Sequence, residues 1–283
     1  MPVLLPDDGL SPSIPLDSPR GVPLIGYDNQ ISQGMLSSSG DDAAGPVTNL
    51  ANPATHLFWR AAFVTSGLYT ITTADPQAGT ANYLGMAGHN FGSQAIGFKL
   101  EGITNLSPQT TVNLLTSSSP GFVTITDDSP IIARFPANAT YVGFKITLNV
   151  VGSVMPQAAV MYAGVLTVLE RGVKVDVTHT PITFGRNTRV INGMSESGNF
   201  LGRIVTGESR VSKADFFGFT PDFYRNTMDD FIDSAQNAPF FWAWAPSDYP
   251  LETGFVWLTK DAVPEVSPDH RRIALSLELA GIA

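Results

Sequence analysis

The chain of 283 residues contains no cysteine. This absence excludes a disulfide framework, thiolate catalysis and zinc or iron–sulfur sites held by cysteine. Charged residues are scarce as well, at 14% of the chain against a typical ~25%, which suggests that other subunits cover much of the surface. The net charge of −9 argues against nucleic acid as a main partner, because phosphate binding requires a cationic surface.

Long apolar runs are also lacking. No stretch approaches the ~20 residues of a transmembrane helix, and the longest candidate, 158–169, is interrupted by Gly164. A secretory signal needs a basic start and an apolar run of about 7–15 residues, whereas the first basic residue here is Arg20. We therefore expect neither a membrane span nor a secretory signal.

Turn formers and apolar residues are plentiful. The chain has 26 glycines, 21 prolines and 43% hydrophobic residues, a composition that favours a mainly β fold with long loops. Charge divides the chain into three regions. Residues 1–46 hold six aspartates and one arginine, residues 47–169 hold four acids and four bases, and residues 170–283 hold fifteen acids and eleven bases. We predict a separate structural unit for each region.

Residues 1–46 are predicted to form an extended, proline-rich arm. Six prolines fall within the first 23 positions, and proline disfavours helix. Two interpretations stay open: a disordered tail, or an arm ordered against a neighbouring subunit. The second accounts for the apolar residues, and the arm's acidic residues would then face bases of the third region. The apolar residues are Leu4, Leu5, Ile14, Leu16, Val22, Leu24 and Ile25, and the bases are Arg186, Arg189, Arg203, Arg210 and Lys213.

Residues 47–169 are predicted to form a β-sandwich of about eight strands. The strongest strand pattern is 142–150, where apolar and polar residues alternate with the period of a half-buried strand. We predict that Trp59 and the face formed by Val142, Phe144 and Ile146 lie in the core of this domain.

Residues 170–283 are predicted to form a smaller α+β domain with one helix against a sheet. Thr220-Pro221-Asp222 provides an N-cap, a proline at the first helical position and an acid in the first turn. Apolar residues then recur at helical spacing until Asn237-Ala238-Pro239. Strands are expected at 240–244, 255–258 and 273–279.

No constellation of catalytic or metal-binding residues stands out. The four histidines are scattered, and neither a nucleophile elbow nor a phosphate-binding loop occurs. The acidic pairs Asp127-Asp128 and Asp229-Asp230 are interpreted as solvated turn and helix residues. The aromatic run 240–244 is interpreted as core or interface packing. We therefore predict no enzymatic activity, no metal and no cofactor.

Three segments resemble a family of tailed-bacteriophage virion proteins. These proteins have a discoidin-type, galactose-binding-like jelly roll followed by a smaller C-terminal β-rich domain. The segments that carry the resemblance are Asn49-Leu50-Ala51-Asn52-Pro53, Leu57-Phe58-Trp59-Arg60 and Tyr83-Leu84-Gly85-Met86-Ala87-Gly88-His89-Asn90-Phe91. Phe91 stands where the family usually has leucine. The resemblance covers residues 47–283 and carries no catalytic set.

The resemblance implies a structural component of the virion, a repeated tail subunit in a ring, sheath or tip. Its partners would be copies of itself and other tail proteins, and it would reach the virion after synthesis in the host cytoplasm. The alternative is a receptor-binding module for a host-surface glycan, with Tyr83, His89 and Asn90 as candidate ligand-binding residues. A glycan-degrading enzyme is a third hypothesis. Such an enzyme needs two carboxylates about 5–10 Å apart in a cleft, and the four acids of residues 47–169 argue against it.

Overall fold

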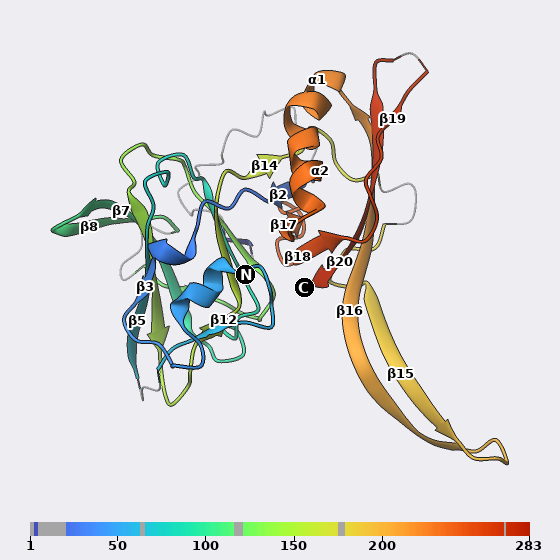
Figure 1. The fold of residues 1–283 in the computed structure, drawn as a ribbon, viewed down its shortest axis with the longest axis horizontal. Helices are drawn as coiled ribbons and strands as arrows, with labels where there is room; N and C mark the ends of the chain where they lie inside the picture. Colours follow the sequence, from blue (N-terminus) through green and yellow to red (C-terminus); the bar gives the residue numbers. More distant parts are fainter. Residues whose placement is uncertain (1–2, 5–20, 63–65, 116–120, 175–178, 269) are drawn as a thin grey trace.

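The computed structural model describes residues 3–4, 21–62, 66–115, 121–174, 179–268 and 270–283. The protein is mainly β, as predicted, and consists of a β-sandwich beside a second, larger sheet that carries a single helical segment (Figure 1). No helix within the described residues is long and apolar enough to cross a membrane.

Two sheets form the sandwich. The first sheet of the sandwich has the order β1 (Val3–Leu4), β10 (Ile131–Arg134), β6 (Tyr83–Ala87), β13 (Val160–Gly164). The opposing sheet of the sandwich has the order β3 (Leu36–Ser38), β5 (Gly67–Ala74), β11 (Gly143–Val150), β7 (Gly97–Leu106), β8 (Gln109–Asn113). Strand β9 (Val123–Thr124) also pairs with β7, and β4 (Trp59–Arg60) pairs with β12 (Gln157–Ala158). The 3-10 turns η1 (Gln33–Met35) and η2 (Val47–Ala51) precede β4.

The predicted core of the sandwich is confirmed. The side chains of Phe144 and Ile146 point inward from β11, the strand between β5 and β7, and both are buried, whereas Val142 is half-buried just before the strand. Trp59 is fully buried, and its indole Nε1 donates a hydrogen bond of 2.9 Å to Oδ1 of Asp41. Alternation along one strand was therefore sufficient to identify this face.

The larger sheet beside the sandwich is called the second sheet from here on. Its order is β14 (Thr167–Val168), β2 (Leu24–Gly26), β17 (Phe240–Ala243), β18 (Thr253–Leu258), β20 (Ile273–Ile282), β16 (Phe200–Phe219), β15 (Arg186–Met194). Strand β19 (Glu265–Val266) pairs with β20. The helical segment consists of α1 (Pro221–Phe223), the π-helical turn η3 (Tyr224–Met228) and α2 (Asp229–Ala235). It packs on one face of this sheet through Met228, Phe231 and Ile232, so the predicted helix-on-sheet unit is confirmed.

The sandwich and the second sheet share an apolar core. Phe241 of β17 and Phe255 of β18 pack there against Tyr162 of β13, with ring centroids 5.6 and 5.7 Å from the tyrosine ring. Alternation along β17 sends Phe240 and Trp242 to the opposite face, toward the helical segment. The aromatic run is therefore core and interface packing, as predicted.

The N-terminal region differs from the extended arm that we predicted. Residues 21–46 pack within their own chain: β2 pairs with β14 and β17, and β3 pairs with β5. Leu24 and Ile25 are buried because neighbouring strands of the same chain cover them. Strand β1 pairs with β10 of the same chain. Residues 5–20 of the predicted arm lie outside the described residues.

The longest apolar run, 158–169, does not form one continuous strand. It is divided into β13, which completes the first sheet of the sandwich, and β14, which lies at the edge of the second sheet. Val165 and Leu166 connect the two strands. This segment therefore passes directly from one unit to the other.

Candidate functional site: a projecting two-stranded ribbon

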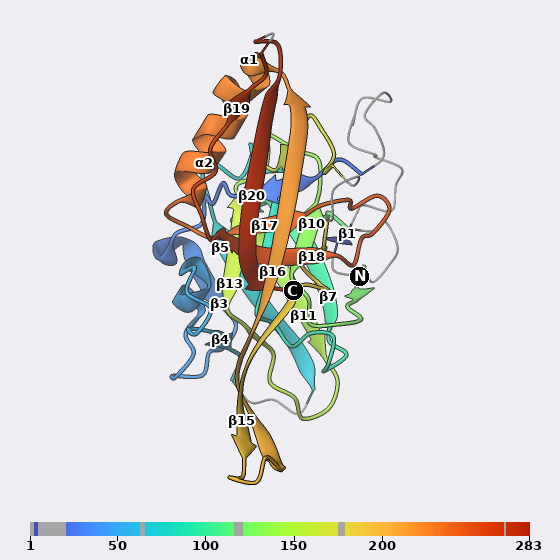
Figure 2. The same ribbon diagram turned by 90° about the vertical axis from the view of Figure 1, so that its right-hand side faces the viewer.

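The most exposed part of the fold is a ribbon, residues 186–210, made of β15 and the first half of β16. Strand β16 pairs with β20 only from Arg210 onward. Before that residue, its only strand partner within the described chain is β15, which it meets between Arg186↔Arg210 and Met194↔Phe200. The ribbon thus extends beyond the body of the protein, as Figures 1 and 2 show at the lower end of the molecule.

The ribbon exposes large apolar side chains on both of its faces. Their exposed fractions lie between 51% and 69%, and the residues are Ile191, Met194, Phe200, Leu201, Ile204 and Val205. A two-stranded hairpin is marginally stable in water unless it packs on something. Apolar side chains grouped on a surface mark an interaction site.

Register places the arginines mainly on one side of the ribbon. Directly opposed residues of paired strands share a face, and successive residues alternate between faces. One side, here called the arginine face, contains Arg186, Thr188, Val190, Asn192 and Met194 of β15 with their partners Arg210, Glu208, Val205, Arg203 and Phe200. This face combines three arginines and one glutamate with four apolar residues.

The ribbon has the opposite charge to the rest of the chain. It holds four arginines and two glutamates, whereas the other residues hold 12 bases and 23 acids. Nε of Arg203 donates to Oδ1 of Asn192, and Nη1 of Arg210 donates to the carbonyl of Thr183. Within the described chain, none of the four arginines forms an ion pair. Their charges are therefore available to a partner.

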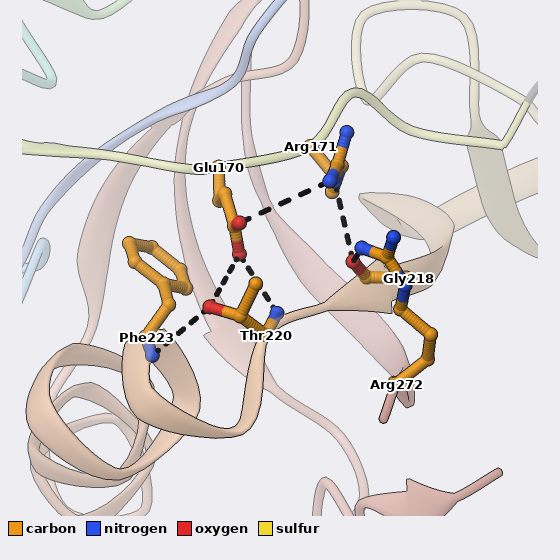
Figure 3. A network of polar contacts seen from close by, with 6 residues as sticks. All are labelled: Glu170, Arg171, Gly218, Thr220, Phe223 and Arg272. Carbon is orange, nitrogen blue, oxygen red and sulfur yellow. Dashed lines mark hydrogen bonds and ion pairs between the residues drawn. The ribbon is translucent and has the colours of Figure 1, made fainter. Parts of the chain in front are cut away.

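A polar network holds the other end of β16 (Figure 3). The carboxylate of Glu170 accepts hydrogen bonds from the backbone N–H and the hydroxyl of Thr220, the residue that caps α1. The carbonyl of Gly218 accepts from Nε of Arg171 at 3.2 Å and from Nη1 of Arg272 at 3.1 Å. Gly218 has a φ of +94°, which glycine tolerates best. The network fixes the turn from β16 into the helical segment.

The three predicted ligand-binding residues do not meet on an open surface. Tyr83 is fully buried, and its hydroxyl donates to the carbonyl of Asp28. The buried ring of His89 stacks on Phe91 at 4.7 Å, and its Nδ1 accepts from the Phe91 N–H. The side chain of Asn90 is engaged by the backbone of Met155 and Gln157. All three serve the fold here, and burial lowers the pKa of His89 to about 4.

The acidic pairs Asp127-Asp128 and Asp229-Asp230 lie in a turn and on the helical segment, as predicted. Oδ1 of Asp128 accepts from the backbone N–H groups of Gly92 and Ser93, and Oδ1 of Asp127 accepts from that of Ser129. Asp229 and Asp230 are exposed on the helical segment. The described residues contain no group of three or more histidine, aspartate or glutamate side chains arranged to hold a metal ion.

Sequence reasoning missed the ribbon. A signal was present, because the polar turn 195–199 separates two segments that each contain apolar residues. We predicted no strand in this region. The alternation in 186–194 and 200–210 is interrupted by two irregularities in register, which obscure the period of two.

No protein-family model and no curated protein matches this chain. Solved structures match about half of this chain. A chitosan-binding module of a Paenibacillus chitosanase/glucanase has 11% identity, covers 48% of this chain and 98% of its own, and has a TM-score of 0.38. A family 32 carbohydrate-binding module of Clostridium perfringens, in complex with GalNAc-β-1,3-galactose, has 12% identity, coverage of 48% and 99%, and a TM-score of 0.37. These values carry no inference about a ligand.

Proposed function

We propose that this protein is a non-enzymatic structural subunit that assembles with further copies of itself through the ribbon. The observation that carries the proposal is the ribbon's exposure: its apolar side chains are more than half exposed, and its outer backbone edges pair with no strand of the described chain. Association is the ordinary way to remove such a surface from water. Interfaces of permanent assemblies are correspondingly apolar.

The setting that we propose is the tail of a tailed bacteriophage, where the subunit would be part of a ring, sheath or tip. The sequence resemblance described above supports this setting, together with the low content of charged residues. Other tail proteins would be further partners. The subunit would be made in the host cytoplasm and incorporated into the virion there.

Replacing Met194 and Phe200 by serine is expected to weaken self-association by roughly 100-fold or more. These two side chains lie opposite each other on the arginine face of the ribbon, and burying a methionine or phenylalanine side chain contributes about 1.5–3 kcal/mol. Sedimentation velocity over a concentration series measures the effect. The melting temperature is expected to stay the same, because both side chains are already exposed in the single chain.

The matched control is the double variant Leu68→Ser/Val151→Ser, which removes two exposed apolar side chains from the sandwich instead. It is expected to associate like the wild type. A wild-type protein that stays monomeric at every concentration contradicts the proposed function, as does a ribbon variant that assembles normally.

Carbohydrate binding by the sandwich is the second candidate. It rests on the loop after β6, where the side chain of Asn90 is half-buried rather than enclosed. Under our first proposal, a glycan array and calorimetry with galactose-containing glycans will detect no binding. Binding that disappears in Asn90→Ala, with the fold intact, would favour the second candidate.

A further inference from the structure

The exposed side of the helical segment is acidic. Asp222, Asp229, Asp230 and Asp233 are exposed there, while Met228 and Phe231 face the sheet. Arg225 is the one base among residues 221–235. None of the four aspartates forms an ion pair within the described chain. We call these four residues the acidic helix face.

The arginine face and the acidic helix face lie at opposite ends of one strand. The ribbon holds the beginning of β16, and the helical segment starts directly after its end, with Thr220 as the cap (Figure 1). At about 3.3 Å per residue, the 20 residues of β16 span roughly 66 Å. Even Arg210 is separated from Asp222 by several times the ~8 Å over which salt screens charges. One chain therefore cannot pair these two faces with each other.

We propose that the arginine face of one copy docks on the acidic helix face of a second copy. This inference rests on the proposed function and specifies its contact. Charge complementarity selects a copy of the same chain as the partner: the ribbon offers unpaired guanidinium groups, and the helix offers unpaired carboxylates. Arginine pairs with carboxylates through two parallel hydrogen bonds. The apolar residues between the arginines add buried area, and the charged pairs set the orientation.

The contact joins two different surfaces, so each copy can dock its own ribbon and receive the ribbon of another. Where the contact is made once per pair, one ribbon and one helix stay free, and repetition builds rings where the rotation closes and filaments where it does not. Where it is made reciprocally, two copies form a closed twofold dimer.

A lipid surface is the other partner that an apolar and basic ribbon suggests. The turn at the tip of the ribbon argues against membrane binding. The turn between the strands is Ser195-Glu196-Ser197-Gly198-Asn199, and these polar residues would have to enter the membrane before the apolar ones. The ribbon is therefore suited to lie along a protein surface rather than to insert by its tip.

Charge reversal tests the proposal. In the full-length chain, Arg186→Glu/Arg203→Glu reverses the charge of the arginine face, and Asp229→Arg/Asp230→Arg/Asp233→Arg reverses the charge of the acidic helix face. Each of these two variants alone is expected to self-associate at least 10-fold more weakly than the wild type in sedimentation velocity. Mixing the two variants, or combining all their substitutions in one chain, is expected to restore association to within a few-fold. Thermal melts check that each variant folds.

The control is Asp261→Arg, which reverses an exposed acid outside the helical segment and is expected to leave association unchanged. If Met194→Ser/Phe200→Ser abolishes assembly while charge reversal has no effect, or has an effect that mixing does not rescue, the ribbon docks on a surface other than the acidic helix face. The inference then fails and the proposed function stands. If no ribbon variant alters assembly, both fail. Binding of the wild type to vesicles of anionic phospholipid without self-association would overturn the inference in favour of a membrane.

Discussion

Replacing Phe241 by alanine is expected to lower the free energy of unfolding by about 3–5 kcal/mol. The ring is fully buried between the sandwich and the second sheet, against Tyr162 and Phe255. It also covers Gly85 so closely that a Cβ at that position would lie 2.6 Å from the ring. Removing the ring leaves a cavity, and this cavity cannot collapse because β17, which carries Phe241, is paired with β18 on one side and β2 on the other. Urea denaturation followed by tryptophan fluorescence measures the loss.

The comparison variant is Phe217→Ala. Phe217 lies on the second sheet but is 61% exposed, so its loss is expected to change the free energy of unfolding by less than about 1 kcal/mol. Equal destabilisation by the two substitutions would show that Phe241 does not join the two units as described.

Lowering the pH from 7.5 to 4 is expected to destabilise the protein through His89 by about 3 kcal/mol. Burial lowers the pKa of His89 from 6.5 to about 4, so the folded protein keeps this imidazole neutral over most of that range and protonates it in about half of the molecules only at pH 4. The unfolded chain binds a proton below about pH 6.5. Stability from this group is therefore fully present above that pH and is lost as the pH falls toward 4.

The variant His89→Gln isolates this effect, because glutamine is neutral at every pH and retains a polar side chain. Its free energy of unfolding is expected to fall less than that of the wild type between pH 7.5 and pH 4, with a difference of about 3 kcal/mol. Parallel pH profiles for the two proteins would show that the imidazole is not held neutral by burial.

Elements with a strong local pattern were predictable from the sequence. The helix was marked by the cap Thr220 and the proline that follows it. Strand β11 was marked by five alternating apolar positions, and the burial of Phe144 by its place in that pattern. In each case the residues that specify the element lie within one turn or one strand, so no knowledge of distant partners was needed.

Elements that depend on distant partners were not predictable. The proline content of residues 1–46 favours extended backbone, but it does not indicate that β2 and β3 insert into two different sheets. Tyr83 was a candidate ligand residue because sugar sites usually need an exposed aromatic ring. Its ring is instead buried with residues from other parts of the chain, including Leu24 and Phe241, and its hydroxyl donates to the carbonyl of Asp28, 55 positions away. The ribbon was missed because a strand is recognised in a sequence by apolar residues on one buried face, whereas the apolar residues of the ribbon are exposed on both faces.

Strand β16 has a mechanical consequence. A pull on the ribbon acts along the strand, whereas the hydrogen bonds that join it to β20 between Arg210 and Phe219 run across it. Those bonds are loaded in shear and resist together, instead of being peeled apart one after another. The load then reaches Gly218 and Thr220, which Arg171, Arg272 and Glu170 hold from two other parts of the chain. A subunit gripped by its ribbon is thus built to withstand tension along its length.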